Sequence, residues 1–172
     1  EGKIVMPDED MDRDMYHRAV DILDSFGLKQ YEISNFAKPG FQCKHNLVYW
    51  HNEEYLGVGA GSHSKLFGKR FWNVSPINAY MEMINSGKLP VLGEEQLNKE
   101  DNMWENLFLG LRLNEGVNIK EFEMKFEIDF LQKYGKKIDY LIKNDLLIQR
   151  NENIKLTSKG RDLSNIVFIE LS

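Results

Sequence analysis

Residues 31–64 read YEISNFAKPGFQCKHNLVYWHNEEYLGVGAGSHS, and the interpretation of the rest of the chain depends on this stretch. It contains three of the four histidines, the only cysteine, and the glycines Gly57, Gly59 and Gly61. Imidazole, amide and aromatic side chains therefore lie beside backbone that can approach a ligand closely. We expect the functional site here and a supporting scaffold on either side.

Length and composition limit the class of protein. The chain has 172 residues, is 42% hydrophobic and carries a net charge of −5. We expect a globular protein, with no general attraction to nucleic acid or to an anionic bilayer. The lone cysteine excludes an internal disulfide, and no apolar run has the length of a membrane span, so we expect a cytoplasmic protein with no integral membrane segment. The start at Glu1 without a methionine predicts a fragment of a longer protein.

A helix and a strand are expected before the motif-rich part. Apolar residues recur at helical spacing and predict a buried helix face that ends before Gly27. A strand over residues 30–36 follows, with polar residues at its end. This order is the repeating unit of an α/β barrel, whose active groups lie at the C-terminal ends of strands, although one unit does not prove a barrel. The apolar positions are Met15, Ala19, Ile22 and Phe26.

The segment KHNLVYW combines an imidazole, an amide and two aromatic rings. On a helix or a tight turn, His45 and Tyr49 share one face, so a ring nitrogen and a flat apolar wall could flank a planar ligand. Two alternatives stay open. His45 could be a hydrogen-bonded packing residue, or it could join Cys43 and His51 at a zinc ion, although their spacing matches no common structural zinc site.

The glycines of GVGAG do not form a dinucleotide-binding fingerprint. That fingerprint needs a helix opening at its third glycine, whereas residues 62–74 predict a β-hairpin with a turn at Gly68-Lys69. We expect Gly57, Gly59 and Gly61 to line a segment where the backbone packs closely against a strand or a ligand.

A helix capped by Ser75 and ended by Gly87 comes next, and we expect it to be structural. Residues 88–96 contain proline and glycine and are predicted to be a connector. The composition changes beyond this segment, so we place a domain boundary near residue 97.

The part from Asn98 predicts three helices, a hairpin and a closing helix that starts at Thr157, which is the element order of a winged helix. Such folds often bind DNA through lysines of the third helix. Residues 98–172 carry 12 Lys and Arg against 13 Asp and Glu, so we favour a packing module over a nucleic-acid-binding one. The candidate DNA contacts are Lys133, Lys136, Lys137 and Lys143.

A family resemblance rests on three ordered motifs. The runs YEISNFAKPG, KHNLVYW and GVGAGSHS, with a tail ending in LTSKGRDL, resemble the C-terminal part of the radical SAM family of oxygen-independent coproporphyrinogen III oxidases and their relatives. The resemblance covers nearly the whole chain. The HNxxYW signature resembles the haem-chaperone (HemW-type) branch, because the oxidases carry a less aromatic sequence at that place.

The resemblance implies an α+β fold in two parts. Residues 1–97 would be the last helix and strand of a partial radical SAM (β/α) barrel, with motif-bearing loops and a β-hairpin. Residues 98–172 would be the winged-helix-like C-terminal domain of the coproporphyrinogen oxidase family.

The resemblance also implies site residues. The haem-iron ligand of the family carries over onto His45, with Asn46, Tyr49 and Trp50 as the supporting haem-binding motif. A second group lies at a strand end facing the S-adenosylmethionine side, although a polar strand terminus is often only a capped edge. Its members are Glu32, Ser34 and Asn35.

The full-length family members imply a [4Fe-4S] cluster, S-adenosylmethionine and haem. Three closely spaced cysteines hold the cluster, and Cys43 is alone, so we expect no radical chemistry, no catalytic residue and no cofactor other than haem in this chain. The motif favours a haem chaperone that binds haem or porphyrin and passes haem to acceptor haem proteins. The alternatives are a fragment of a decarboxylating coproporphyrinogen III oxidase and, less favoured, a winged-helix nucleic-acid-binding module.

Overall fold

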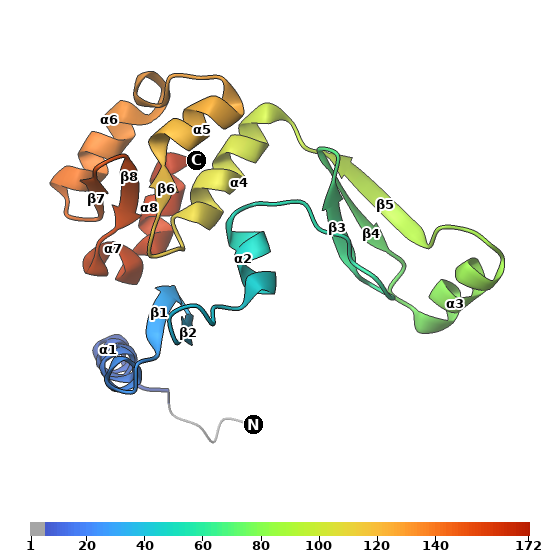
Figure 1. Ribbon diagram of the computed structural model, residues 1–172, viewed down its shortest axis with the longest axis horizontal. Coiled ribbons are helices and arrows are strands. Elements are labelled where there is room, and N and C mark those ends of the chain that lie inside the picture. Colours follow the sequence, from blue (N-terminus) through green and yellow to red (C-terminus); the bar gives the residue numbers. More distant parts are fainter. Residues whose placement is uncertain (1–5) are drawn as a thin grey trace. The chain divides into compact units, whose positions relative to one another are not determined.

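The computed structural model describes residues 6–172, so the prediction attached to the start at Glu1 lies outside the described residues. The chain forms two compact units (Figure 1). One unit combines the described residues up to Lys44 with residues 110–172, and the other consists of residues 45–109. This division differs from the boundary expected near residue 97, which stays a prediction. No helix within residues 6–172 is long and apolar enough to cross a membrane.

The first unit begins with helix α1 (Glu9–Ser25), strand β1 (Lys29–Glu32) and strand β2 (Asn35–Ala37). The Asp8 carboxylate accepts a hydrogen bond of 2.8 Å from the Met11 amide, and the acidic first turn complements the helix dipole. The two strands pair antiparallel as a hairpin. The single strand predicted over residues 30–36 is therefore wrong, because the chain reverses at Ile33 and Ser34.

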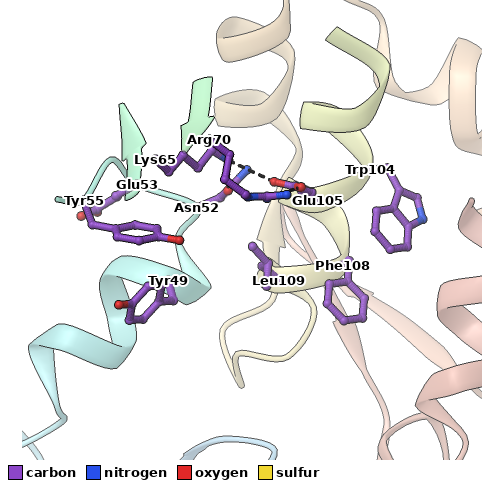
Figure 2. Close-up of a pocket in the computed structure, with 10 residues that line it drawn as sticks. All are labelled: Tyr49, Asn52, Glu53, Tyr55, Lys65, Arg70, Trp104, Glu105, Phe108 and Leu109. Carbon is purple, nitrogen blue, oxygen red and sulfur yellow. Dashed lines mark hydrogen bonds and ion pairs between the residues drawn. The ribbon is translucent and has the colours of Figure 1, made fainter. Parts of the chain in front are cut away.

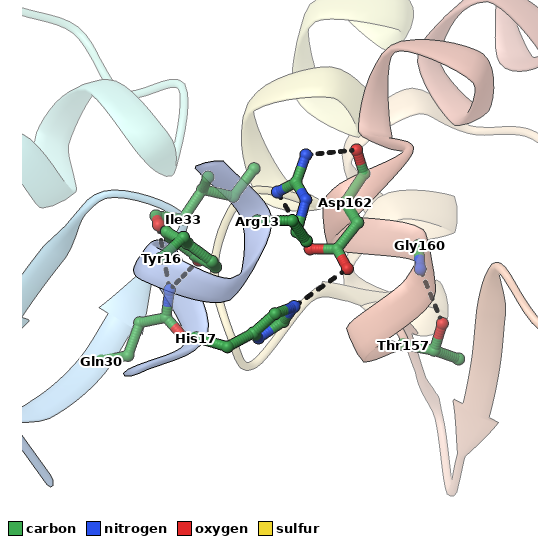
Figure 3. A network of polar contacts seen from close by, with 8 residues as sticks. All are labelled: Arg13, Tyr16, His17, Gln30, Ile33, Thr157, Gly160 and Asp162. Atoms are coloured by element: carbon green, nitrogen blue, oxygen red, sulfur yellow. Dashed lines mark hydrogen bonds and ion pairs between the residues drawn. The ribbon is translucent and has the colours of Figure 1, made fainter. Parts of the chain in front are cut away.

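The predicted buried face of α1 is also wrong. No residue of this helix is buried, and the exposed fractions of Met15 and Phe26 are 59% and 74%. The helix is held instead by polar contacts, drawn in Figure 3. Arg13 and His17 each contact the Asp162 carboxylate at 3.1 Å, and the Tyr16 hydroxyl donates to a backbone carbonyl. Directional polar contacts therefore fix this end of the chain within its unit.

Residues 110–172 supply the helical layer and a small sheet of the same unit. Strands β6, β8 and β7 pair antiparallel in that order. The elements are β6 (Val117–Asn118), α5 (Ile119–Phe126), α6 (Phe130–Lys143), β7 (Leu147–Arg150), β8 (Asn153–Leu156), α7 (Ser158–Asp162) and α8 (Ser164–Leu171). The fold is mixed α/β.

Local sequence explains most of these boundaries. The side chains of Asn118 and Thr157 accept hydrogen bonds from the amides of Glu121 and Gly160, so both cap a helix, and the helix start predicted at Thr157 is confirmed. The closing helix is not continuous, because it breaks at Leu163 into α7 and α8. The hairpin of β7 and β8 is confirmed.

The core of this unit is a cluster of aromatic rings from α5 and α6. The Phe122 ring lies 5.3 Å from the Phe130 ring in an edge-to-face arrangement, and the Phe130 ring lies 5.2 Å from the Tyr134 ring. Phe126 packs on Phe122 at 4.6 Å. Edge-to-face ring pairs add to the free energy gained from burial alone.

The second unit carries helix α2 (Lys44–Trp50), which begins at the unit boundary, and a three-stranded antiparallel sheet. The predicted hairpin is confirmed, with its turn at Phe67-Gly68, one residue earlier than predicted. Both turn residues have positive φ, 54° and 73°, as a type I′ turn requires. The strands are β3 (His63–Leu66), β4 (Lys69–Asn73) and β5 (Val91–Gln96).

Strand β5 corrects the connector predicted over residues 88–96. It pairs with β4, and its Gly93 lies under the indole of Trp72, where an added Cβ would come within 2.6 Å of a ring carbon. The glycine that suggested a loop thus makes room for a ring. Helix α3 (Ile77–Asn85) lacks the predicted Ser75 cap, because Pro76 occupies the cap position and makes no side-chain cap bond. Helix α4 (Lys99–Gly110) follows β5.

We expect Phe130→Ala to lower the free energy of unfolding by about 3–5 kcal/mol, because it leaves a cavity among the rings of α5 and α6. The measurement is denaturant unfolding followed by circular dichroism. Leu131→Ala, at an exposed neighbouring position, is the matched control and should change the value by about 0.5 kcal/mol or less. Equal losses in the two variants would contradict the described core.

We expect Asp162→Asn to loosen α1 without unfolding the unit. The variant loses the carboxylate that pairs with Arg13 and His17, and partly exposed ion pairs contribute about 1 kcal/mol or less. Hydrogen exchange of α1 amides should rise by up to roughly fivefold, the factor that 1 kcal/mol gives, while α6 amides stay unchanged. Asp139→Asn, at an exposed position on α6, is the control. Unchanged exchange in α1 would show that other contacts hold this helix.

Candidate functional site

Helix α2 brings the predicted imidazole and aromatic side chains onto one face, as the spacing predicts. The rings of His45 and Tyr49 meet edge to face with their centres 4.9 Å apart. The Tyr49 ring in turn contacts the Tyr55 ring at 4.6 Å. His45 is exposed, whereas Asn46 and Trp50 are half-buried. The site is thus a short row of rings with an accessible imidazole at its open end.

A pocket of about 280 Å³ lies beside this row and is lined by residues of the second unit alone (Figure 2). Tyr49 and Tyr55 form one wall. Trp104 and Phe108 from α4 form the other, with their rings stacked nearly parallel and 5.2 Å apart. The pocket therefore offers flat apolar surfaces on two sides.

A charged network lines part of the pocket. The Glu105 carboxylate on α4 accepts from Lys65 Nζ at 3.1 Å and from Arg70 Nη2 at 2.6 Å. Lys65 is buried and also donates to the side chains of Asn52 and Asn102. One carboxylate thus connects α4 to both strands of the β3–β4 hairpin, and the buried ammonium has its hydrogen-bond partners.

The network shifts the pKa values of Glu105 and Arg70. Burial raises the pKa of Glu105, but hydrogen bonds from Arg70 and Lys65 lower it more, so this pKa lies below its usual range. Burial of the hydroxyl and the nearby Tyr49 raise the pKa of Tyr55. Burial lowers the pKa of Arg70, and the contact with Glu105 more than restores it, so the net direction is upward. The ion pair is therefore charged at neutral pH.

The glycine segment packs against strand β3. A Cβ added at Gly57 would lie 2.1 Å from the His63 carbonyl oxygen, and the Gly57 amide donates to Ser64 Oγ. Gly59 and Gly61 have φ of 109° and 70°, where side chains are rarely tolerated. The close approach predicted for this segment is thus made to a strand, and a further approach to a ligand stays a prediction.

The structure brings Glu32, Ser34 and Asn35 together in the other unit. The Glu32 carboxylate is fully buried and accepts from the Ser34 amide at 2.7 Å and from Asn35 Nδ2 at 2.6 Å. Its second oxygen lies 3.6 Å from Arg112 Nη2. These contacts turn the β1–β2 hairpin, and the S-adenosylmethionine-side role of the three residues stays a prediction.

The described residues give no support to the zinc alternative. Nowhere in residues 6–172 do three or more His, Cys, Asp or Glu side chains lie where they could hold a metal ion together. Cys43 is exposed and unpaired as a thiol. The donor set also does not fit an iron–sulfur cluster, which needs several cysteines where this chain has one.

Several pocket residues were not foreseen as site residues. Tyr55 lies within residues 31–64 but in none of the three shorter motifs, and Lys65 and Glu105 lie beyond that stretch, with contacts that join positions 40 residues apart. A contact between residues so far apart produces no periodic pattern in the sequence, so it could not be predicted from spacing. One indication was available, since Trp104 and Phe108 are spaced to share a helix face.

Comparison with known proteins shows which proteins this chain resembles in sequence. Residues 97–163 match the HemN C-terminal domain. Over 97% of its length, the chain is 42% identical to the haem chaperone HemW of Lactococcus lactis subsp. lactis (strain IL1403) and 37% identical to that of Bacillus subtilis (strain 168). The chain is a relative of the HemW-type haem chaperones. It spans 44% of the length of each of these two relatives, and the predicted family resemblance is confirmed.

The fold of this chain is also found in a solved structure. Coproporphyrinogen III oxidase (HemN) from Escherichia coli, described as a radical SAM enzyme, matches 96% of this chain and 42% of its own with a TM-score of 0.73. The sequences are 16% identical, so this likeness concerns the fold alone. It supports a HemN-like mixed α/β region, and the winged-helix and barrel details stay predictions.

We expect Glu105→Gln to reveal the charged network through the pH dependence of stability. At neutral pH, the free energy of unfolding of the wild type should be about 3 kcal/mol higher than that of the variant. The reason is that loss of the Glu105 carboxylate leaves the buried ammonium of Lys65 without its charged partner. A carboxyl group whose pKa is lower in the folded state stabilises the fold at pH values above its unfolded pKa of about 4.3. The difference in unfolding free energy between the two proteins should therefore shrink as the pH falls through the folded-state pKa.

The measurement is urea unfolding of both proteins between pH 7 and pH 3. Glu94→Gln removes an exposed carboxylate that pairs with Lys69 and serves as the control, with a small effect of about 0.5 kcal/mol or less. A difference for Glu105→Gln that stays constant down to pH 3 would contradict an ionised Glu105.

Proposed function

We propose that the chain is the haem-binding part of a haem chaperone, with His45 as the axial ligand of haem iron. The observation that carries this proposal is the exposed imidazole of His45, whose ring meets the Tyr49 ring edge to face. The names of the HemW relatives support it. Transfer to acceptor haem proteins and a cytoplasmic location belong to the same proposal.

The residues around His45 suit a ligand bound at the surface. Haem iron accepts an axial nitrogen ligand, which is the chemistry that the group brings when bound. His45 would supply that nitrogen, and Tyr49 would limit rotation of the imidazole and pack near the macrocycle. The neighbouring pocket of about 280 Å³ lies below the usual size of ligand cavities, so the ring would lie across α2 and outside the pocket. Asn46 and Trp50 would complete the contact.

The oxidase alternative rests on weaker support. The likeness to HemN concerns the fold, and the chain's single cysteine cannot hold an iron–sulfur cluster. In a longer protein that contains this chain together with a radical SAM domain, that domain would bind the iron–sulfur cluster and S-adenosylmethionine. In such a protein, Glu32, Ser34 and Asn35 would face the S-adenosylmethionine side. Anaerobic decarboxylation of coproporphyrinogen III by that protein would favour the oxidase.

We expect His45→Ala to weaken haem binding by at least roughly tenfold, because loss of the axial nitrogen removes a coordinate bond. The measurement is a haem titration followed by the Soret absorbance, on the wild type and the variant. His63→Ala is the matched control, since it removes another exposed imidazole of the same unit, one that stacks on Trp72.

Circular dichroism should show the same fold in all three proteins. Retention of the shifted Soret band and of the affinity in His45→Ala would make His45 a packing residue and overturn the proposal. Equal losses in His45→Ala and His63→Ala would point to adsorption of haem on the protein and overturn it as well.

A further inference from the structure

A second pocket, of about 450 Å³, lies in the unit that contains residues 110–172. It is lined by the outer side of the β7–β8 hairpin and the start of α7, elements that Figure 1 labels, and by Asn114. On the hairpin, Ile148 and Lys155 are cross-strand partners, and Arg150 follows Ile148 on the same side of β7. Its size falls within the range of small-molecule sites.

Three cationic side chains line this pocket, and no Asp or Glu does. They are Arg150, Lys155 and Arg161. Within residues 6–172, neither Arg150 nor Lys155 forms an ion pair. Residues 98–172 carry slightly more acidic than basic side chains, so the absence of an acid here is a local arrangement. Cations that converge on a hollow without neutralising partners concentrate anions there.

Arg161 is held in position. Its Nη1 donates to Asn114 Oδ1 at 2.8 Å, and the Asn114 side chain is anchored in turn by a bond of 2.6 Å to the Gln30 carbonyl. The backbone amide of Asn114 also donates a hydrogen bond to the backbone carbonyl of Tyr31. Only one of the five guanidinium N–H donors is used in this bond, so the remaining donors can serve a ligand from a fixed position.

We propose that this pocket binds a small polyanion, a molecule that carries several phosphate or carboxylate oxygens close together. A single negative charge would leave two of the three cations unmatched, whereas clustered anionic oxygens match all three. Guanidinium groups bind phosphate and carboxylate in the same two-pronged way. The exposed Ser158 hydroxyl adds a donor at the rim, and Ile148 supplies an apolar wall. This site is independent of His45 and of haem.

The test is isothermal titration calorimetry at low salt, with inorganic pyrophosphate and citrate as separate probes. We expect at least one probe to bind the wild type, and Arg150→Gln and Lys155→Gln each to weaken binding by roughly tenfold, as the loss of a charged hydrogen bond would. Both side chains lie on the outer side of the hairpin, so their replacement leaves the buried residues of β7 and β8 in place.

Lys136→Gln makes the same change of charge at an exposed position of α6 and should leave the affinity within about twofold of the wild type, the limit expected for a distant exposed charge. Binding of pyrophosphate alone identifies a phosphate ligand, and binding of citrate alone identifies a carboxylate ligand. Equal weakening in Lys136→Gln, or no binding of either probe at millimolar concentration, would overturn the proposal. Salt-sensitive binding of duplex DNA without binding of the small anions would replace it with a nucleic-acid site.

Discussion

The contact between Glu105 and two cations connects helix α4 to the β3–β4 hairpin in the second unit. The side chain of Lys65 is held by Glu105. The backbone of Lys65 forms two hydrogen bonds with the backbone of Tyr55, one in each direction, and each is 2.9 Å long. Tyr55 packs on Tyr49, and Tyr49 packs on His45. A continuous series of contacts therefore runs from a carboxylate on α4 to the exposed imidazole on α2. Without that carboxylate, Lys65 and Arg70 would repel each other beside the pocket.

Polar contacts also organise the other unit, which is assembled from two distant parts of the chain. Asp162, Asn114 and Arg112 from the C-terminal part each bind residues before Lys44. Apolar contact cannot do this alone, since α1 buries none of its residues. Hydrogen bonds and ion pairs are directional, so they fix where these segments meet, at a modest gain in free energy per contact.

Features governed by local chemistry were predictable from the sequence. Thr157 caps a helix because its side chain reaches the amide three residues ahead, and the spacing of His45 and Tyr49 places them on one helix face. Features governed by distant partners were not. The reversal at Ile33 and Ser34 depends on the buried carboxylate of Glu32, and β5 was not predicted because of Gly93, whose role is visible only with Trp72 above it. Lys65 and Glu105 meet through the fold alone.

The division into two units has an optical consequence. All three tryptophans, Trp50, Trp72 and Trp104, belong to the unit of residues 45–109, and the other unit has only tyrosine and phenylalanine as aromatic chromophores. Indole emission therefore reports on the unit that contains α2. Far-ultraviolet dichroism gives more weight to the other unit, which contains most of the helices. The chain thus has its own spectroscopic label for deciding whether its two units melt in one cooperative step or in two.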